Sequence, residues 1–271
     1  MKKYWIIIFI VSLQLSTKGA TGSQLQTTTE YQVILVNGDI RKKHNQEILV
    51  FKSKFWSNER LSFSTLEDYL ILLDSRKVLF HVTPQKGLVD YDFKPIDAAY
   101  GTKPGKLLLP IDIKNLFDKG PFLILDEELK LEISSSLFPM NEDNFFFLQY
   151  DWSGDSEVVN KKLSWDRNYL ILSKKEIYRV NGNPILPETT SNIKLHYYKA
   201  VEKEMIFLSD VILVFPNEPK LKKEIQFLID QLEGQDLEKT KRTIKNFLFQ
   251  EYGVPEKGNL ADWLKDNFQI D

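Results

Sequence analysis

The sequence predicts an α+β fold in which two small β-rich modules, each a barrel or a sandwich, are followed by a three-helix C-terminal tail. The chain contains 18 Phe and 11 Tyr together with many Val and Ile, residue types that are enriched in strands. Short strand-like runs alternate with Ser, Asn, Asp and Gly turns as far as Pro216. Beyond Pro216 the spacing of apolar residues changes from two to about 3.6, the period of a helix.

Residues 1–22 have the features of a secretory signal peptide. Two lysines precede an apolar run at 4–13, and Ala20-Thr21-Gly22 supplies small residues suited to cleavage. The apolar run is short for a membrane span, and a retained anchor is the alternative. We therefore expect export to a periplasm or the extracellular medium, no membrane span after cleavage, and a flexible polar leader at 23–30.

The composition excludes several classes of protein. Residues 1–22 contain three lysines and no acid, so the remaining chain has 33 basic and 38 acidic residues, a formal net charge of −5. Basic residues alternate with acids almost everywhere, and no basic stripe suited to nucleic acid is present. The chain contains no cysteine. Disulfides and a lipoprotein-type anchor are therefore excluded, and a packed core must stabilise the fold.

The first β module is expected over residues 31–86. Residues 31–36 are strand-like, and Asn37-Gly38 after them is the dipeptide most suited to a tight hairpin turn, because both residues tolerate positive φ. Further strands of this module are expected at 48–52, 60–64, 69–73 and 78–82. Residues 87–110 are rich in Pro and Gly with little apolar periodicity, which predicts a linker or long loop at a domain boundary.

The second β-rich module is expected over residues 111–216. Its predicted strands lie at 122–125, 129–133, 145–152, 169–172, 177–180, 193–198 and 205–215. Asn181-Gly182 follows the fifth of these and predicts a second hairpin turn.

Residues 217–271 are predicted to form a helical tail. Asn217 can cap the first helix and Gly234 can end it, while the second starts near Asp236 and stops at Gly253. The third is expected to be capped by Asn259. Its apolar face would contain Leu260, Trp263, Leu264 and Phe268. These helices can pack on each other or on a sheet, or they can present a face to a partner, and periodicity does not separate the two.

No catalytic residue, metal ligand or cofactor is predicted. The histidines are His44, His81 and His196, and none has a second His at the spacing of a zinc helix. Gly154-Asp155-Ser156 resembles the start of a GDS-type serine esterase motif, but the partner residues of that family do not follow, so a polar hairpin tip is expected. Acidic clusters at 90–97, 126–128 and 141–144 are expected to be solvated turns rather than calcium sites.

Five aromatic residues are the candidate partner-binding residues. Trp56, Trp152 and Trp165 lie near polar turns, where rings can stack on sugars or anchor a protein. Trp263 and Phe268 lie on the apolar face of the third predicted helix. Core packing of the same rings is the alternative.

The chain resembles a group of uncharacterised exported proteins from Bacteroidetes-type bacteria over most of its length after residue 22. The segments that carry the resemblance are Leu61–Ser64 with Asp68–Leu72, Asn160–Leu163 with Tyr178–Gly182, and Tyr252–Pro255 with Asn259-Leu260 and Trp263-Leu264. The resemblance implies an exported β-rich protein with a helical tail and assigns no chemistry. The first module also resembles the small β-rich envelope domains of FecR-type regulators.

The predicted function is that of an exported, non-enzymatic binding or accessory protein of the cell envelope, which recognises a protein or glycan partner. One alternative is a secreted hydrolase, esterase-like or glycosidase-like, with a site assembled from distant acids, Ser156 or His196. Another is a structural subunit of an envelope assembly. A hydrolase should show a cleft where titratable groups converge, whereas a binding protein should show an exposed aromatic or apolar patch.

Overall fold

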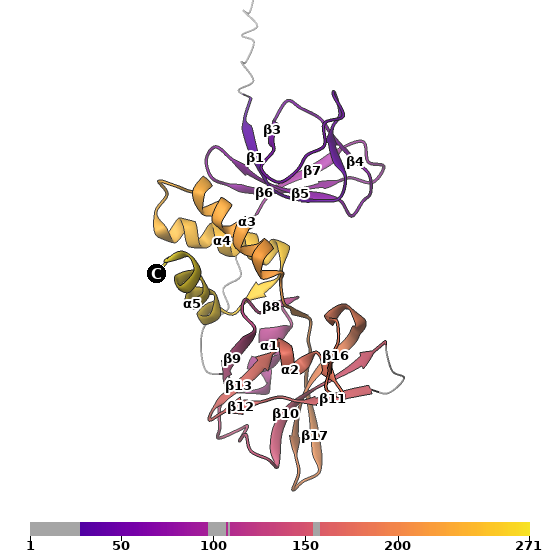
Figure 1. Ribbon diagram of the computed structural model, residues 1–271, viewed down its shortest axis with the longest axis vertical. Coiled ribbons are helices and arrows are strands. Elements are labelled where there is room, and N and C mark those ends of the chain that lie inside the picture. Colours follow the sequence, from indigo (N-terminus) through magenta and orange to yellow (C-terminus); the bar gives the residue numbers. More distant parts are fainter. Residues whose placement is uncertain (1–27, 97–106, 108, 154–157) are drawn as a thin grey trace, which may run out of the picture.

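The computed structural model describes residues 28–96, 107, 109–153 and 158–271. The chain has the mixed α+β fold that the sequence predicts. Figure 1 shows an elongated molecule with one sheet toward one end, a second group of strands at the other, and helices between them. None of the sheets formed by the described residues closes into a barrel, so the barrel alternative is wrong.

The first sheet has five antiparallel strands in the order β3-β1-β5-β6-β7. Their bounds are β1 Glu30–Asn37, β3 Lys54–Trp56, β5 Tyr69–Asp74, β6 Leu79–Pro84 and β7 Tyr91–Pro95. A separate ladder pairs β2 (Ile40–Lys42) with β4 (Leu61–Phe63). The central strand β5 is apolar at successive positions because both faces of the sheet are covered: Leu70 and Leu72 belong to one core, and Ile71 and Leu73 to another.

The turn after β1 is not the predicted two-residue hairpin. β1 pairs with β3 and β5 rather than with β2, and only Gly38 has positive φ. A Cβ at Gly38 would lie 2.1 Å from Oδ1 of Asp68. The side-chain amide of Asn37 donates to the carbonyl of Glu67 at 3.1 Å. Gly38 therefore leaves room for the side chain of Asp68, and Asn37 holds the 67–68 loop by a hydrogen bond.

The prediction of a strand at 48–52 is wrong. Ile48 forms only an isolated bridge with Arg41, and the chain joins the sheet later, at β3. Lys52 has a φ of +71°, which interrupts an extended run, and its amide donates to the carbonyl of Val33 at 3.0 Å. Turn geometry therefore prevails over β propensity in this segment.

The predicted linker 87–110 contains a strand, β7, which corrects that prediction at 91–95. Tyr91 and Phe93 pack against the core of the first sheet that contains Leu70 and Leu72. Asp92 and Lys94 form an ion pair at 3.2 Å. Pro95 is tolerated because β7 is an edge strand. The predicted linker residues 97–106 and 108 lie outside the described residues, as do the predicted signal peptide and the Gly154-Asp155-Ser156 tip.

The second β region contains two larger antiparallel sheets, ordered β11-β10-β16-β17 and β12-β13-β9. Their strands are β9 Glu128–Glu132, β10 Asn144–Trp152, β11 Val158–Lys162, β12 Trp165–Asp166, β13 Tyr169–Ser173, β16 Thr190–Lys199 and β17 Glu204–Asp210. Inward-facing side chains of both sheets belong to one core, which also contains Ile113 and Phe117 of helix α1 (Pro110–Phe117). A 3-10 turn, η1 (Pro187–Thr189), precedes β16.

The second Asn-Gly prediction is confirmed. Asn181 and Gly182 have φ values of +50° and +82° and connect the paired strands β14 (Arg179–Val180) and β15 (Asn183–Pro184). The strand predicted at 177–180 is wrong in its first two residues, because helix α2 (Lys174–Ile177) extends through Ile177 and Tyr178 is its C-cap.

The helices after Pro216 are α3 (Glu218–Gln231), α4 (Leu237–Glu251) and α5 (Lys257–Phe268). The predicted cap of the first helix is confirmed, because Asn217 accepts from the amide of Lys220. The second helix starts where predicted, and Asp236 caps it by accepting from the amide of Lys239. The predicted cap of the third helix is wrong. Glu256 caps α5, and Asn259 instead accepts from the amide of Leu125 at 3.2 Å.

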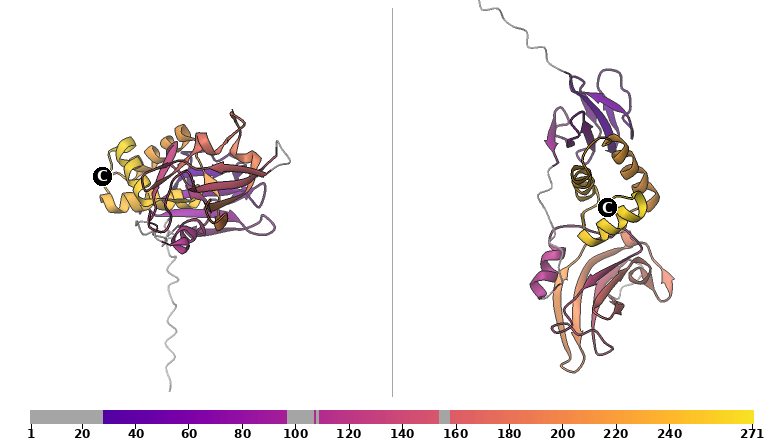
Figure 2. Two further views of the ribbon diagram at one scale, coloured as in Figure 1. Left: turned by 90° about the horizontal axis from the view of Figure 1, so that it is seen from below. Right: turned by 90° about the vertical axis from the view of Figure 1, so that its left-hand side faces the viewer.

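These helices lie between the two β-rich ends of the molecule and not beyond them, as Figures 1 and 2 show. Side chains of α3, α4 and α5 share one core with Ile34, Ile71 and Leu79 of the first sheet. None of the described helices is long and apolar enough to cross a membrane.

A small parallel sheet connects the helical segment to the second β region. Its order is β18-β8-β19, with bounds β18 Leu213–Val214, β8 Phe122–Leu123 and β19 Val254–Pro255. The amide of Val254 donates to the carbonyl of Pro121 at 2.7 Å. Gly253 permits this approach: its φ is +116°, and a Cβ there would lie 2.2 Å from the Pro121 oxygen. Three segments far apart in the sequence therefore meet at one point.

Candidate functional site

The candidate site is the outer face of the four-stranded sheet in the second β region. In β10, Phe146 and Leu148 point into the core and alternate with residues on the other face. Side chains directly opposite on antiparallel strands share a face. The register aligns Phe147 with His196 and Phe207, and Phe145 with Tyr198 and Met205. We call these six residues the aromatic face: Phe145, Phe147, His196, Tyr198, Met205 and Phe207.

The rings of the aromatic face are in mutual contact. The Phe147 ring and the His196 imidazole stack with centroids 5.0 Å apart and planes 13° apart. Phe207 meets the imidazole at an angle on the other side, at 5.6 Å. Phe145 and Tyr198 lie 5.4 Å apart. Such pairs add packing energy beyond their buried area, so the rings form a rigid surface.

Exposure increases from the middle of this face toward its edge. His196 is 5% exposed and Phe147 is buried, whereas Phe207 is 51% exposed and Met205 is 56% exposed. Both exposed residues lie on β17, the edge strand of the sheet. The aromatic face therefore combines a covered centre with two large apolar side chains in water.

His196 is the unusual residue at the centre. Both ring nitrogens are buried and have no hydrogen-bond partner among the described residues. Burial lowers the pKa of His196, and the charge of Lys194 lowers it further, while Asp210 acts in the opposite direction. The imidazole is therefore neutral at neutral pH. An unsatisfied buried polar group of this kind costs about 1–3 kcal/mol.

Polar side chains border the aromatic rows. The register places Asn160, Gln149, Lys194 and Asp210 side by side as the next row across the four strands. The amide of Gln149 donates to the side chain of Asn160 at 3.1 Å. On the far side, the ammonium of Lys162 lies 4.4 Å from the centre of the Phe145 ring, within cation–π range.

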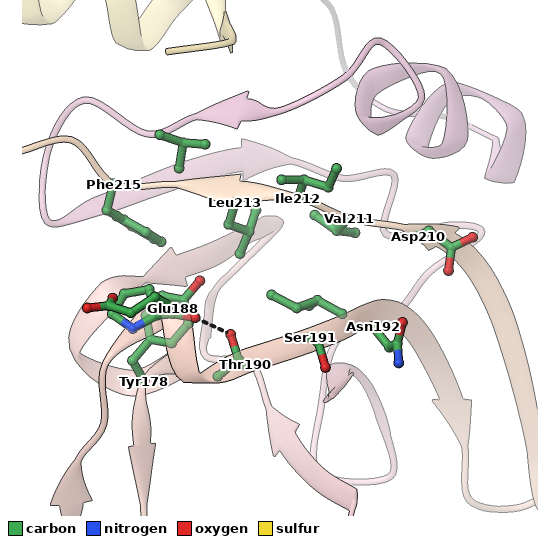
Figure 3. Close-up of a pocket in the computed structure, with 13 residues that line it drawn as sticks. Tyr178, Glu188, Thr190, Ser191, Asn192, Asp210, Val211, Ile212, Leu213 and Phe215 are labelled. Atoms are coloured by element: carbon green, nitrogen blue, oxygen red, sulfur yellow. Dashed lines mark hydrogen bonds between the residues drawn. The ribbon is translucent and has the colours of Figure 1, made fainter. Parts of the chain in front are cut away.

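A groove of about 600 Å³ lies in the second β region, between the start of β16 and the chain from Asp210 to Phe215. Figure 3 shows Asp210 near one end of the groove and Glu188 toward the other, with apolar side chains between them. Catalysis by a nucleophile and a base requires the two groups within hydrogen-bond reach. Among the described residues that line the groove, Glu188 and Asp210 are the carboxylates, and Figure 3 shows them toward different ends of it.

The predicted partner-binding residues do not form one surface: they lie in different parts of the fold, and Trp263 and Phe268 contact each other. Trp56 is 39% exposed on the edge strand β3 of the first sheet. Trp152 is partly buried against the core of the second region, and Trp165 lies under the ammonium of Lys162 at 5.0 Å. Trp263 is 1% exposed and Phe268 packs against it, which fits the core-packing alternative for both.

Sequence reasoning missed Phe145, Phe147 and Phe207 as candidate residues. The signal was present in β10, where Phe145-Phe146-Phe147 puts large aromatic rings on both faces of a strand. A strand with one solvated face would alternate apolar and polar residues. The departure from alternation therefore indicates a second apolar face.

Among the described residues, no group of three or more His, Asp or Glu is placed to hold a metal ion. His44 is exposed near Glu59, and His81 packs on the ring of Tyr69 at 5.2 Å.

Two acids of the helical segment are linked to tyrosines near the first sheet. The hydroxyl of Tyr69 donates to Glu251 at 2.7 Å, and that of Tyr252 donates to Glu224 at 2.6 Å. Burial raises the pKa of both carboxyls, and the hydrogen bonds from the tyrosines act against it. The charge of Glu224 raises the pKa of Glu251 further. These contacts connect β5 with α3 and α4, so the cluster lies within the packed structure.

The unfolding free energy should decrease as pH rises because of this pair. Between the ordinary Glu pKa of about 4.3 and the raised folded pKa values, the folded chain still holds protons on Glu224 and Glu251 that the unfolded chain has released. The stabilisation from these protons is therefore complete below a pH of about 4.3 and is lost as pH rises through the folded pKa values. Glu251→Gln keeps an acceptor for Tyr69, and it should flatten this slope and raise stability at neutral pH. Urea unfolding between pH 4 and 8 measures the effect. The exposed Glu233→Gln should retain the original slope, and equal slopes in both variants would contradict the assignment.

Comparisons with known proteins found no matching family model, no matching curated protein and no matching solved structure. The family resemblance seen in the sequence therefore stays a prediction, and function has to be argued from the site.

Proposed function

We propose that this protein is an exported, non-enzymatic binding or accessory protein of the cell envelope that recognises a protein partner through the aromatic face. Its organisation is that of two β-rich regions, the first from β1 to β7 and the second within residues 111–216, with a three-helix segment at 217–271. The observation that carries the proposal is the exposed pair Met205 and Phe207 beside the buried Phe147–His196 stack.

The chemistry of this surface fits a protein interface. Aromatic residues and Met are enriched at the centres of interfaces, and the residues that contribute most to binding sit beside a polar rim. Phe207 has such a rim in the row from Asn160 to Asp210. Exposed apolar side chains on an edge strand also favour pairing with another chain.

A glycan is the second candidate, because rings beside amides and charged groups can stack on sugars while the polar row bonds hydroxyls. Gln149 and Asn160 supply the amides, and Lys194 and Asp210 the charges. A glycan array with the purified chain separates this candidate from a protein partner.

Phe207→Asp should reduce capture of the partner at least tenfold. Removing a central interface ring costs about 2 kcal/mol or more, and a carboxylate in its place opposes reburial. The measurement is quantitative cross-linking mass spectrometry of the chain from residue 23 onward in an envelope fraction.

Val89→Asp is the matched control, because Val89 is an exposed apolar residue on the first β region. Both variants should keep the original circular dichroism and melting temperature. If Phe207→Asp captures the same proteins in the same amounts as Val89→Asp, the aromatic face is not the binding site.

A further inference from the structure

A cavity separate from the aromatic face lies between helices α4 and α5. Its volume is about 530 Å³, within the range of small-molecule sites. Leu260, Leu264 and Ile270 form an apolar wall. Arg242, Lys245 and Lys257 also line the cavity, so positive charge and apolar surface meet in one place.

The positive charge of this cavity is incompletely neutralised. Each of its two acids is paired with a lysine: Glu238 lies 3.3 Å from the ammonium of Lys241, which also lines the cavity, and Asp271 lies 2.9 Å from that of Lys265. Lys245 and Lys257 have no ion pair within the described part of the chain.

The charges around Lys245 also indicate a site that would bind an anion. Burial lowers the pKa of Lys245, and the positive charges of Lys257 and Lys119 lower it further. None of the described carboxylates opposes this shift. An anion at this point would relieve the repulsion among the three lysines.

The two acids limit what kind of anion fits. Glu238 and Asp271 line the same cavity, and they would repel a polyanion such as a nucleotide or nucleic acid. A single negative charge can approach Lys245 and Lys257 while an apolar group covers the wall at Leu260 and Leu264. We propose that this cavity binds an amphipathic organic carboxylate, with its carboxylate at Lys245 and Lys257 and its apolar tail against α5.

Isothermal titration of the chain from residue 23 onward with octanoate tests the proposal. We expect saturable binding at one site, weakened by added salt because the contact is ionic. Octanol, which has the tail without the charge, and acetate, which has the charge without the tail, should each bind at least tenfold more weakly. Absence of octanoate binding, or equal binding of octanol, would overturn the proposal.

Variants locate the binding. Lys245→Met with Lys257→Met removes both charges but keeps apolar stems, and it should weaken octanoate at least tenfold. Lys223→Ala, an exposed lysine of α3 outside the cavity, should leave the affinity unchanged. If the double variant binds octanoate as the unchanged chain does, the site lies elsewhere and the proposal fails.

The carboxylate can come from a free fatty-acid-like molecule or from the end of a peptide with an apolar last residue. A parallel titration with N-acetyl-leucine distinguishes them, because tighter binding of octanoate identifies the first source and tighter binding of N-acetyl-leucine the second. Both ligands should lose affinity in the double variant. The experiment uses no partner of the aromatic face, so its result is independent of the proposed function.

Discussion

Trp263→Ala should lower the free energy of unfolding by about 3–5 kcal/mol, the usual cost of removing a large buried aromatic side chain. Trp263 is among the largest fully buried side chains of the chain. Its ring contacts that of Phe268 at 5.2 Å, and it belongs to the core shared by α3, α4, α5 and the first sheet. The indole nitrogen has no partner among the described residues, so the loss is one of packing rather than hydrogen bonding.

Urea unfolding followed by circular dichroism measures this effect. Trp56→Ala is the control, because Trp56 is partly exposed on an edge strand, and it should cost less than about 1 kcal/mol. Equal losses for the two tryptophans would show that Trp263 is not the core residue described above.

Gly253→Ala should destabilise the protein by more than about 3 kcal/mol, because two penalties act together. A φ of +116° is strained for any residue with a Cβ, and that Cβ would lie 2.2 Å from the backbone oxygen of Pro121. Relief requires β19 to move away from β8, which breaks the hydrogen bond between Val254 and Pro121.

Gly234→Ala separates the two penalties. Gly234 also has positive φ, at +83°, but a Cβ there would meet nothing within 4 Å. Only the backbone term remains, about 1–2 kcal/mol. Thermal unfolding of both variants gives the comparison, and a loss at Gly253 no larger than that at Gly234 would mean that the β8–β19 contact readily adjusts.

Local chemistry accounts for what the sequence could predict. Asn217 caps the first helix as expected, and the second helix starts at Asp236 as expected, because each of these caps involves residues three positions apart. Asn181-Gly182 forms its hairpin because the flanking strands are themselves partners. In each case the interaction that decides the structure lies within a few residues of the motif.

Contacts between distant segments account for the failures. Asn37-Gly38 has the same composition as the second hairpin, yet the loop at Asp68 determines its shape. Asn259 has the composition of a cap but bonds Leu125. Neither partner can be identified from spacing, because nothing in the local sequence specifies which remote backbone comes near.

The candidate site was harder to predict than the fold. Alternation within a strand separates Phe147 from Phe146, but it does not say which residues of other strands lie beside Phe147. The registers that align His196 and Phe207 with it depend on strand pairing, including a bulge in the pairing of β16 with β17. Exposure of a ring also depends on whether another layer covers the sheet, which the sequence does not state. Trp263 shows the converse, since its helix face is covered by α3, α4 and the first sheet.

The shared core of the first sheet and the helices also sets the order in which the chain can fold. A ribosome completes β1, β5 and β6 well before it reaches α3, α4 and α5, so Ile34 and Ile71 face water during most of synthesis. The β8–β19 pairing can form when Val254 emerges, after α4 and before α5. The core shared by the first sheet and the helices is therefore completed late in synthesis, whereas the core of the second β region consists of residues that emerge before α3.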